Sequence, residues 1–407
     1  MDKYLEFKKI CNNLDYYPTR SDLIYKYGFK NDELQLIQQH KLTDDSFLKI
    51  NLKDQLGRNL LYWNNEKIMM DFLGSHDLIR NSELLSYFNF DESEIINGFI
   101  FSEIESNLSI EGIRSTRAQI EKLSSTNYDD ITNTNDIIVK NMLLGYEFVK
   151  NNKITEENIF NLYNILSKKS LTEQEKLLSG NYYRHDEVDI VDSNGTVVDK
   201  GINHKLLPQL MNDLITFINK EKTLSEHLIA SHIIHYYLIL LHPYFDFNGR
   251  MARVLSFWYN YQNAPSFSLM LANEAINNNL NKKNYYNAII NSRQMNNDIT
   301  YFLEYISRII LSYSKLYINY YHILKKFKNK GVILQRSTEN AIKAVLGLSS
   351  LDNNYFSWKD YNSFTNDQFT KQYCLRLLNS LVELEILETS EDKKVKLFKL
   401  NKNMLLF

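Results

Sequence analysis

The sequence predicts a mainly helical protein with a small β-hairpin in its central core and a winged helix domain at its C-terminal end. The 407 residues include only 12 glycines and 4 prolines, and this scarcity of helix breakers favours long helices and few long loops. The helical pattern is broken at residues 187–200, where alternating β-branched residues flank an Asn194-Gly195 turn. After Ser337, helical segments lead into a strand, a charged turn at Glu391–Lys394 and a second strand.

The same patterns divide the chain into residues 1–90, 91–330 and 331–407. The first region is expected to form short helices with polar breaks, and the last is expected to form the winged helix domain. In the middle region, apolar residues at helical spacing and helix-start signals predict a series of helices. These expected helices span residues 91–111, 135–150, 155–168, 226–241 and 283–329, and the capping-box patterns TEQE (172–175) and TLSE (223–226) each precede a helix.

Composition and charge argue against several classes of protein. The formal net charge is −2 at pH 7, so no overall basic field favours nucleic acid. The two cysteines, Cys11 and Cys374, lie far apart and suit a reducing compartment. The most apolar stretch, residues 228–245, contains histidines and is expected to be a buried helix rather than a membrane span. The N-terminal sequence lacks a secretion signal, so the predicted location is the cytoplasm.

The segment LHPYFDFNGRMAR, residues 241–253, is expected to link two helices. Pro243 disfavours helical geometry at His242, so the first helix should end there, and the next should begin near Gly249. Free N–H groups at the start of a helix bind anions. The compact backbone at Asn248-Gly249 would let a phosphate come close to those groups.

Four side chains of this segment suit phosphate chemistry. Arg250 and Arg253 are three residues apart, so both can lie on one side of the first helical turn and hold a polyphosphate. Asp246 could hold a magnesium ion, and His242 could accept a proton from a hydroxyl nucleophile. Each residue alone also fits a helix cap or a solvated surface. In combination, they indicate phosphoryl or nucleotidyl transfer to a hydroxyl.

The stretch HPYFDFNGRMAR resembles the signature of the Fic family, whose usual form is HPFxDGNGRxxR. The matching positions are His242, Pro243, Asp246, Asn248, Gly249, Arg250 and Arg253. Tyr244 stands where phenylalanine is usual, and Phe247 stands where a small residue, usually glycine, is expected. The resemblance extends over roughly residues 90–310.

Three further segments carry the resemblance. GNYYRHDEVDIV is similar to the segment that leads into the family's flap, which implies that the hairpin at residues 188–199 pins a target by strand-like pairing. KKNYYNAI is similar to the segment whose tyrosine pair lines the nucleotide pocket, and His235 matches a common family position. The nucleotide-binding residues that these likenesses imply are Val188, Asp189, Ile190, Val191, Tyr285 and Tyr286.

The resemblance implies a protein adenylyltransferase that uses ATP, with Mg²⁺ at Asp246. His242 would take the proton from a tyrosine, threonine or serine hydroxyl of a target protein, and that hydroxyl would attack the α-phosphate. Pyrophosphate would leave while held by Arg250, Arg253 and the Asn248-Gly249 amides. This protein itself is one candidate target.

The segment SNLSIEGI resembles the family's inhibitory motif, (S/T)xxxE(G/N). Glu111 and Gly112 match the motif, and Asn107 stands at the Ser/Thr position. The resemblance implies that Glu111 pairs with Arg253 and so takes the guanidinium group that the γ-phosphate needs. The same carboxylate could instead position a water for removal of AMP, or be an ordinary surface acid at a helix end.

Two alternatives to adenylyl transfer stay open at this stage. One keeps the fold but removes AMP or transfers another nucleotide or phosphate group, with Phe247 reshaping the phosphate-binding loop. The other is a winged-helix regulator whose core senses nucleotide without catalysis. Residues 334–407 contain ten Lys and Arg residues and nine Asp and Glu residues, and this nearly neutral charge disfavours DNA as the partner. Target recognition, packing on the core or homodimerisation by this region remain open.

Overall fold

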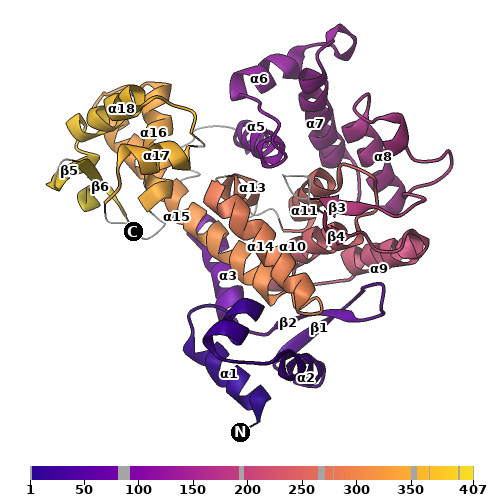
Figure 1. Cartoon of the computed structure of the whole chain (residues 1–407). Helices are drawn as coiled ribbons and strands as arrows, with labels where there is room; N and C mark the ends of the chain where they lie inside the picture. Colours follow the sequence, from indigo (N-terminus) through magenta and orange to yellow (C-terminus); the bar gives the residue numbers. More distant parts are fainter. Residues whose placement is uncertain are drawn as a thin grey trace.

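The computed structural model describes residues 2–80, 92–191, 197–264, 271–277, 279–349, 355–365, 367–392 and 395–406. Helices dominate these ranges, which confirms the expected fold class (Figure 1). The strands within them form three separate antiparallel hairpins, β1–β2, β3–β4 and β5–β6. No helix of these ranges combines the length and the apolar character that a membrane span requires.

The N-terminal region contains helices and also a β-hairpin that the sequence did not predict. Its elements are α1 (Lys3–Asn13), a π-helix (Asp22–Lys26), α2 (Asn31–Lys41), β1 (Phe47–Lys53), β2 (Asn59–Trp63) and α3 (Glu66–Arg80). The expectation of helices alone is therefore wrong between residues 47 and 63. The hairpin register shifts between Ile50 and Lys53, and this irregularity interrupts the two-residue alternation that marks a strand.

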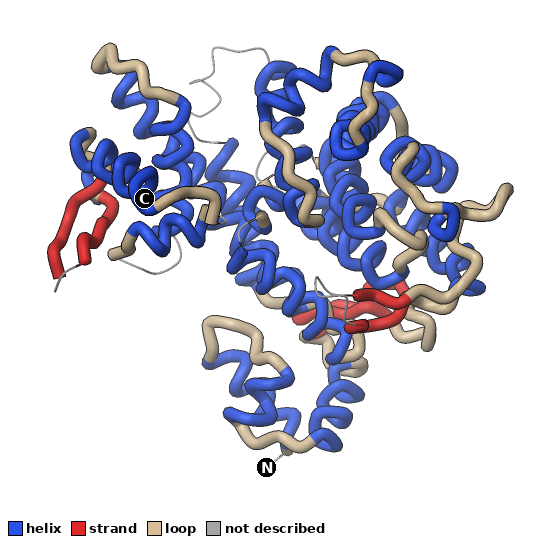
Figure 2. The backbone as a smooth tube through the Cα atoms, turned by 45° about the horizontal axis from the view of Figure 1, so that its top comes forward, coloured by secondary structure: helices blue, strands red, loops and turns tan. Residues whose placement is uncertain are grey.

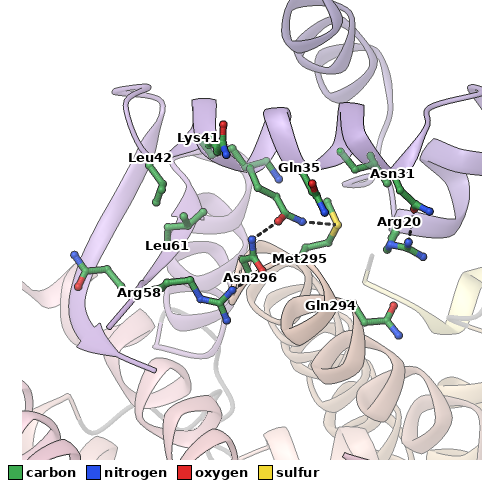
Figure 3. A pocket seen from close by; sticks show the side chains of 14 residues that line it. Arg20, Asn31, Gln35, Lys41, Leu42, Arg58, Leu61, Gln294, Met295 and Asn296 are labelled. Atoms are coloured by element: carbon green, nitrogen blue, oxygen red, sulfur yellow. Dashed lines mark hydrogen bonds between the residues drawn. The ribbon is translucent and has the colours of Figure 1, made fainter. Parts of the chain in front are cut away.

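The N-terminal region joins the core beside the start of α15 (Thr300–Asn329). There, the buried Asp298 accepts a hydrogen bond from the buried Lys41 (2.7 Å). A cavity of about 670 Å³ lies between α2 and the end of α14 (Asn279–Gln294), as Figure 3 shows. Asn296 joins its walls through hydrogen bonds with Gln38 and Arg58. The polar groups of this cavity thus hold the two regions together.

The core contains the expected series of helices and the expected hairpin. Its elements are α5 (Glu92–Ile110), α6 (Arg117–Ser125), α7 (Thr134–Asn151), α8 (Glu156–Ser167), β3 (Asp189–Val191), β4 (Val197–Lys200), α9 (Leu207–Asn219), α10 (Leu224–Leu241), α11 (Asn248–Asn263), α13 (Ala272–Ile276), α14 and α15. The Asn194-Gly195 turn lies outside the described residues.

Two details of the core differ from the sequence prediction. The TEQE pattern begins only a single 3-10 turn, Glu173–Glu175, rather than a longer helix. The helix expected over residues 283–329 is divided into α14 and α15. Asn296 and Asn297 cause this division because both have positive φ angles, of 56° and 60°, which a continuous α-helix does not allow.

Helix α10 lies within the core and is buried along most of its length. It begins at the capping box of Thr223 and Glu226 that the TLSE pattern predicted, and it packs against α11 (Figure 1). Its two buried histidines contact other side chains of the core: the ring of His232 stacks on Phe72, with 5.2 Å between ring centroids, and His235 hydrogen bonds to Tyr285. No cluster of three potential metal ligands occurs in the described part of the chain.

In its described residues, the C-terminal region forms helices followed by a hairpin, in the order that the sequence predicted, and a short 3-10 turn (Lys402–Met404) follows. The helices and strands are α16 (Arg336–Ser349), α17 (Trp358–Phe364), α18 (Lys371–Glu383), β5 (Leu387–Asp392) and β6 (Val395–Leu400). Residues 393–394 of the expected charged turn lie outside the described residues. The β5–β6 hairpin lies at the outer edge of the molecule, away from α10 and α11 (Figure 1 and Figure 2). Its interpretation as the wing of a winged helix stays a prediction.

Candidate active site

The loop between α10 and α11 is held in one shape by its own residues. His242 ends α10 with a left-handed backbone (φ 51°, ψ 58°), and Phe247 precedes α11 with a second one (φ 71°, ψ 3°). The side chain of Asn248 donates to the carbonyl oxygen of Tyr244 (2.8 Å) and accepts from its N–H (3.0 Å). The amide side chain of Asn248 is therefore committed to the loop, which leaves its backbone N–H for a ligand.

The aromatic ring of Tyr244 faces the interior of the protein rather than the loop surface. It stacks on Tyr163 of α8, with 3.9 Å between the ring centroids and 5° between the planes. This contact anchors the loop on the helices below it. Tyr244 therefore serves packing, and its ring is not exposed at the loop surface.

The N-terminus of α11 has no side-chain cap, so its first N–H groups remain available to an anion. Gly249 lies in this first turn. A Cβ atom built there would lie 2.6 Å from Oε1 of Glu111, which shows that the Glu111 carboxylate occupies the space directly over the helix terminus. The carboxylate thus lies where the sequence predicted a phosphate.

Arg253 is buried and pairs with the end of α5. Its Nε donates to Oδ1 of Asn107 (2.8 Å), and its Nη2 donates to the Glu111 carboxylate. Burial alone would raise the pKa of Glu111, but Arg253 and Arg250 bring that pKa below its ordinary value. Glu111 is therefore ionised at neutral pH. Asn107 thus helps to hold Arg253 beside Glu111.

The unusual Phe247 does not prevent the left-handed turn before α11. A non-glycine residue in this conformation costs about 1–2 kcal/mol. The guanidinium carbon of Arg250 lies 3.5 Å from the centroid of the Phe247 ring, and Nη2 of Arg250 lies 3.1 Å from Oδ2 of Asp246. This stacked, paired arrangement partly offsets the strain and holds Arg250 beside the loop.

Asp246 is the one residue that the sequence assigned to a metal. Its side chain is 46% exposed and its Oδ2 contacts only Arg250 among the described residues. A single half-exposed carboxylate fits Mg²⁺, which usually takes one or two protein carboxylates and completes its shell with water and phosphate oxygens. The donor set is therefore compatible with a magnesium ion that arrives with a nucleotide.

His242 is largely withdrawn from solvent. Burial, together with Arg293 and Arg184, lowers its pKa to about 4. Its imidazole is therefore neutral at pH 7, the state in which a ring nitrogen can accept a proton. Its Nδ1 is buried and has no hydrogen-bond partner in the described part of the chain.

Arg184, to which no sequence pattern assigned a role, connects the loop to the hairpin. The side-chain Nε of Arg184 donates to the carbonyl oxygen of His242 (2.8 Å). The backbone N–H of Arg184 donates to the carbonyl oxygen of Pro243 (2.9 Å). Its other guanidinium nitrogens donate to the carbonyl oxygens of Asp186 (2.6 Å) and Ile202, which flank the hairpin. Arg184 lies within the GNYYRHDEVDIV segment, but no local sequence pattern predicts these long-range contacts.

We expect Arg184→Met to lower the free energy of unfolding by about 2–4 kcal/mol, because it leaves buried carbonyl oxygens without donors. Urea denaturation followed by circular dichroism would measure this loss. The exposed Lys200 of β4 offers a control, and Lys200→Met should change the stability by less than about 0.5 kcal/mol. Equal stabilities of the two variants would contradict the assigned role of Arg184.

The hairpin forms the predicted antiparallel pair beside this loop. Asp189 pairs with Lys200 and Ile190 with Asp199, and Asp199 forms an ion pair with Arg293 of α14. Arg293 also donates to the carbonyl oxygen of Ile239 near the end of α10 (2.9 Å), so it ties the hairpin to the helix that carries His242.

The predicted flap residues differ in their exposure to solvent. Val188 and Ile190 are half-buried and Asp189 is exposed, whereas the Val191 side chain lies outside the described set. Contact of these four residues with a nucleotide stays a prediction.

The two tyrosines of α14 also differ from each other. Tyr285 is 1% exposed, and its hydroxyl hydrogen bonds with Nε2 of His235 (2.8 Å). Tyr286 is 41% exposed, so its ring is the accessible one. Tyr285 therefore supports the wall of the site, and Tyr286 is the better candidate for direct contact with a base.

A further acid, which no sequence pattern singled out, lies in α5 on the face that carries Asn107 and leads to Glu111 just beyond the helix end. Glu103 is buried and accepts hydrogen bonds from Tyr146 (3.1 Å) and Asn273. Burial raises its pKa to about 8, so it is mainly protonated at neutral pH. Glu103 lies four residues before Asn107 and eight residues before Glu111, and this helical spacing could have identified it as part of the face that packs toward Arg253.

Comparison with known proteins agrees with this geometry. Residues 153–259 match the Fic/DOC family and include the hairpin, α10, the loop and most of α11. The chain therefore carries a Fic domain, of the class that transfers nucleotidyl or other groups.

The solved structures that resemble this chain include two Fic proteins. One is a Fic family protein from Desulfovibrio desulfuricans G20, with 16% identity, a TM-score of 0.48, and coverage of 82% of this chain and 96% of that chain. The other is a fragment of Fic-1 from C. elegans, with 17% identity, a TM-score of 0.44, and coverage of 65% and 74%. No curated protein matches the sequence.

Proposed function

We propose that this protein transfers AMP from ATP to a hydroxyl group of a protein and that Glu111 restrains the transfer. The observation that carries the proposal is the position of the Glu111 carboxylate, which lies over the N-terminus of α11 and on Arg253. A carboxylate in that position marks a site built for an anion. Gly249, Arg250 and Arg253 surround the same space and suit a polyphosphate.

In the proposed reaction, the hydroxyl oxygen of the target attacks the α-phosphorus of ATP. The new P–O bond forms as the bond from the α-phosphorus to the bridging oxygen of the β-phosphate breaks, and pyrophosphate leaves. The neutral imidazole of His242 accepts the hydroxyl proton. The N–H groups at the start of α11, with Arg250 and Arg253, stabilise the charge that develops on the phosphates. Mg²⁺ bound at Asp246 would neutralise further phosphate charge.

The protein partner would supply a tyrosine, threonine or serine hydroxyl, and the β3–β4 hairpin offers the edge on which such a segment could pair. One alternative on the same fold is transfer of another nucleotide or phosphate group, and another is removal of AMP, with Glu111 positioning a water beside the loop. That reaction would release AMP from a modified protein and would attach no label from ATP.

We expect protein that carries Glu111→Gly to become labelled when it is incubated with Mg²⁺ and ATP radioactive at the α-phosphorus. The same protein should stay unlabelled with ATP radioactive at the γ-phosphorus, because that atom leaves in pyrophosphate. Gel autoradiography, with and without a cell extract as the source of target, would measure both. Label from the γ position alone would show a kinase and would contradict the proposal.

A further inference from the structure

Helix α14 presents three side chains to the anion site, and one of them is a lysine. Lys282, Tyr285 and Tyr286 are spaced three and four residues apart, so they share one face of the helix. Both tyrosines lie close enough to Arg253 and Glu111 to interact with their charges. The face that carries Lys282 is thus the face turned toward the Glu111–Arg253 pair.

Lys282 is half-buried and makes neither an ion pair nor a hydrogen bond with any residue that the structure describes. Burial lowers the pKa of Lys282, and Arg253 lowers it further, whereas the nearby carboxylate of Glu111 raises it. A lysine that is partly withdrawn from water usually has an acid as its partner. Lys282 lacks such a direct partner, although it faces the space that Glu111 occupies.

The balance of charge at this site changes when Glu111 leaves. Arg250 keeps its partner, because Asp246 lies 3.1 Å away in the same loop. Arg253 and Lys282 have Glu111 as their nearby acid, so its withdrawal leaves two cations uncompensated. Two adjacent cations in a partly buried cleft favour a ligand that brings at least two negative charges, as the terminal phosphates of a nucleoside triphosphate do.

We infer that Lys282 is a further phosphate-binding residue of this site and contacts the terminal phosphates of the nucleotide once Glu111 has withdrawn. The inference rests on the proposed function, since it assumes a triphosphate in the space over α11. Lys282 supplies a compact charge on a flexible stem, whereas Arg253 is fixed by Asn107. The flexible lysine can follow the phosphates as they become pyrophosphate.

Binding of ATP and of AMP to protein with Glu111→Gly and His242→Ala tests this inference, because such protein should not consume ATP. We expect Lys282→Met in that background to weaken ATP binding by about tenfold, the loss expected for one charge-assisted hydrogen bond. AMP lacks the terminal phosphates, so its affinity should change by less than about twofold. Isothermal titration calorimetry would measure both affinities.

The neighbouring Lys283 is exposed and provides a matched control, so Lys283→Met should leave both affinities unchanged. Lys282→Arg keeps the charge and should retain most of the ATP affinity. Unchanged ATP binding by Lys282→Met, or an equal loss for ATP and AMP, would overturn the inference. If the parent double variant binds no ATP, the proposed function falls as well. If it binds ATP but Glu111→Gly protein transfers no label, only the proposed function is overturned.

Discussion

Replacement of Glu111 with glycine is expected to raise the rate of AMP transfer by about 10- to 100-fold over the unaltered protein. This range corresponds to the loss of a charge-assisted hydrogen bond that competes with the γ-phosphate for Arg253. The Glu111 carboxylate binds Arg253 directly and covers the N-terminus of α11, so ATP and Glu111 cannot take the same position. Initial rates of label incorporation from ATP radioactive at the α-phosphorus would measure the effect.

Two further variants separate the charge of Glu111 from its bulk. Glu111→Gln removes the charge but retains the size, so its rate should lie between those of the unaltered protein and Glu111→Gly. Glu105 lies in α5, shortly before Glu111 in the chain, and lines a separate groove with α15 and α16, so Glu105→Gln should leave the rate unchanged. Equal rates for the unaltered protein and Glu111→Gly would show that Glu111 does not restrain transfer.

The sequence predicted the loop well because its signals are local. Pro243 and the apolar run before it define where α10 ends, and Asn248-Gly249 marks where α11 begins. Gly112 has a positive φ of 78°, as expected for a glycine just after the end of a helix, here α5. Each of these positions depends on the conformational preference of one or two residues, so a short window of sequence was sufficient.

Contacts between distant segments could not be derived from local patterns. Glu111 and Arg253 are 142 residues apart, and only the resemblance to a family motif suggested that they meet. Arg184 bonds to the carbonyl oxygen of a residue 58 positions away, and no sequence rule assigns an arginine to a backbone oxygen. The sequence did not single out Lys282 because one lysine on a helix surface is ordinary. Only the charged groups near it in the structure suggest a phosphate-binding role.

The effect of Phe247 could not be predicted either. The sequence showed a bulky residue where the backbone needs a left-handed turn, and it left open whether the loop would change shape. The structure keeps the turn and places the ring against the Arg250 guanidinium. Stacking between side chains of neighbouring turns depends on their rotamers, which composition and spacing do not specify.

Replacement of His242 with alanine in protein that already carries Glu111→Gly is expected to reduce AMP transfer by about 10²- to 10⁴-fold, the usual contribution of a general base. ATP binding should persist, because Arg250, Arg253 and the α11 terminus remain. His40 is exposed and lies in the N-terminal region, so His40→Ala provides a control with no expected loss.

The pH dependence gives this role of His242 an independent test. The pKa of His242 is lowered to about 4 by burial, Arg293 and Arg184, so the base is neutral and competent across the range from pH 6 to 8. Transfer should therefore persist as the pH falls through the ordinary histidine pKa of about 6.5.

The same shift affects folding with a defined sign. The folded protein holds His242 neutral, whereas the unfolded chain binds a proton below about pH 6.5. The free energy of unfolding should therefore fall as the pH is lowered from about 6.5 towards 4, and His242→Ala should reduce that slope. Urea denaturation at several pH values would measure it. A transfer rate that drops with an apparent pKa near 6.5, or a His242→Ala variant that transfers AMP at the parent rate, would exclude His242 as the buried base.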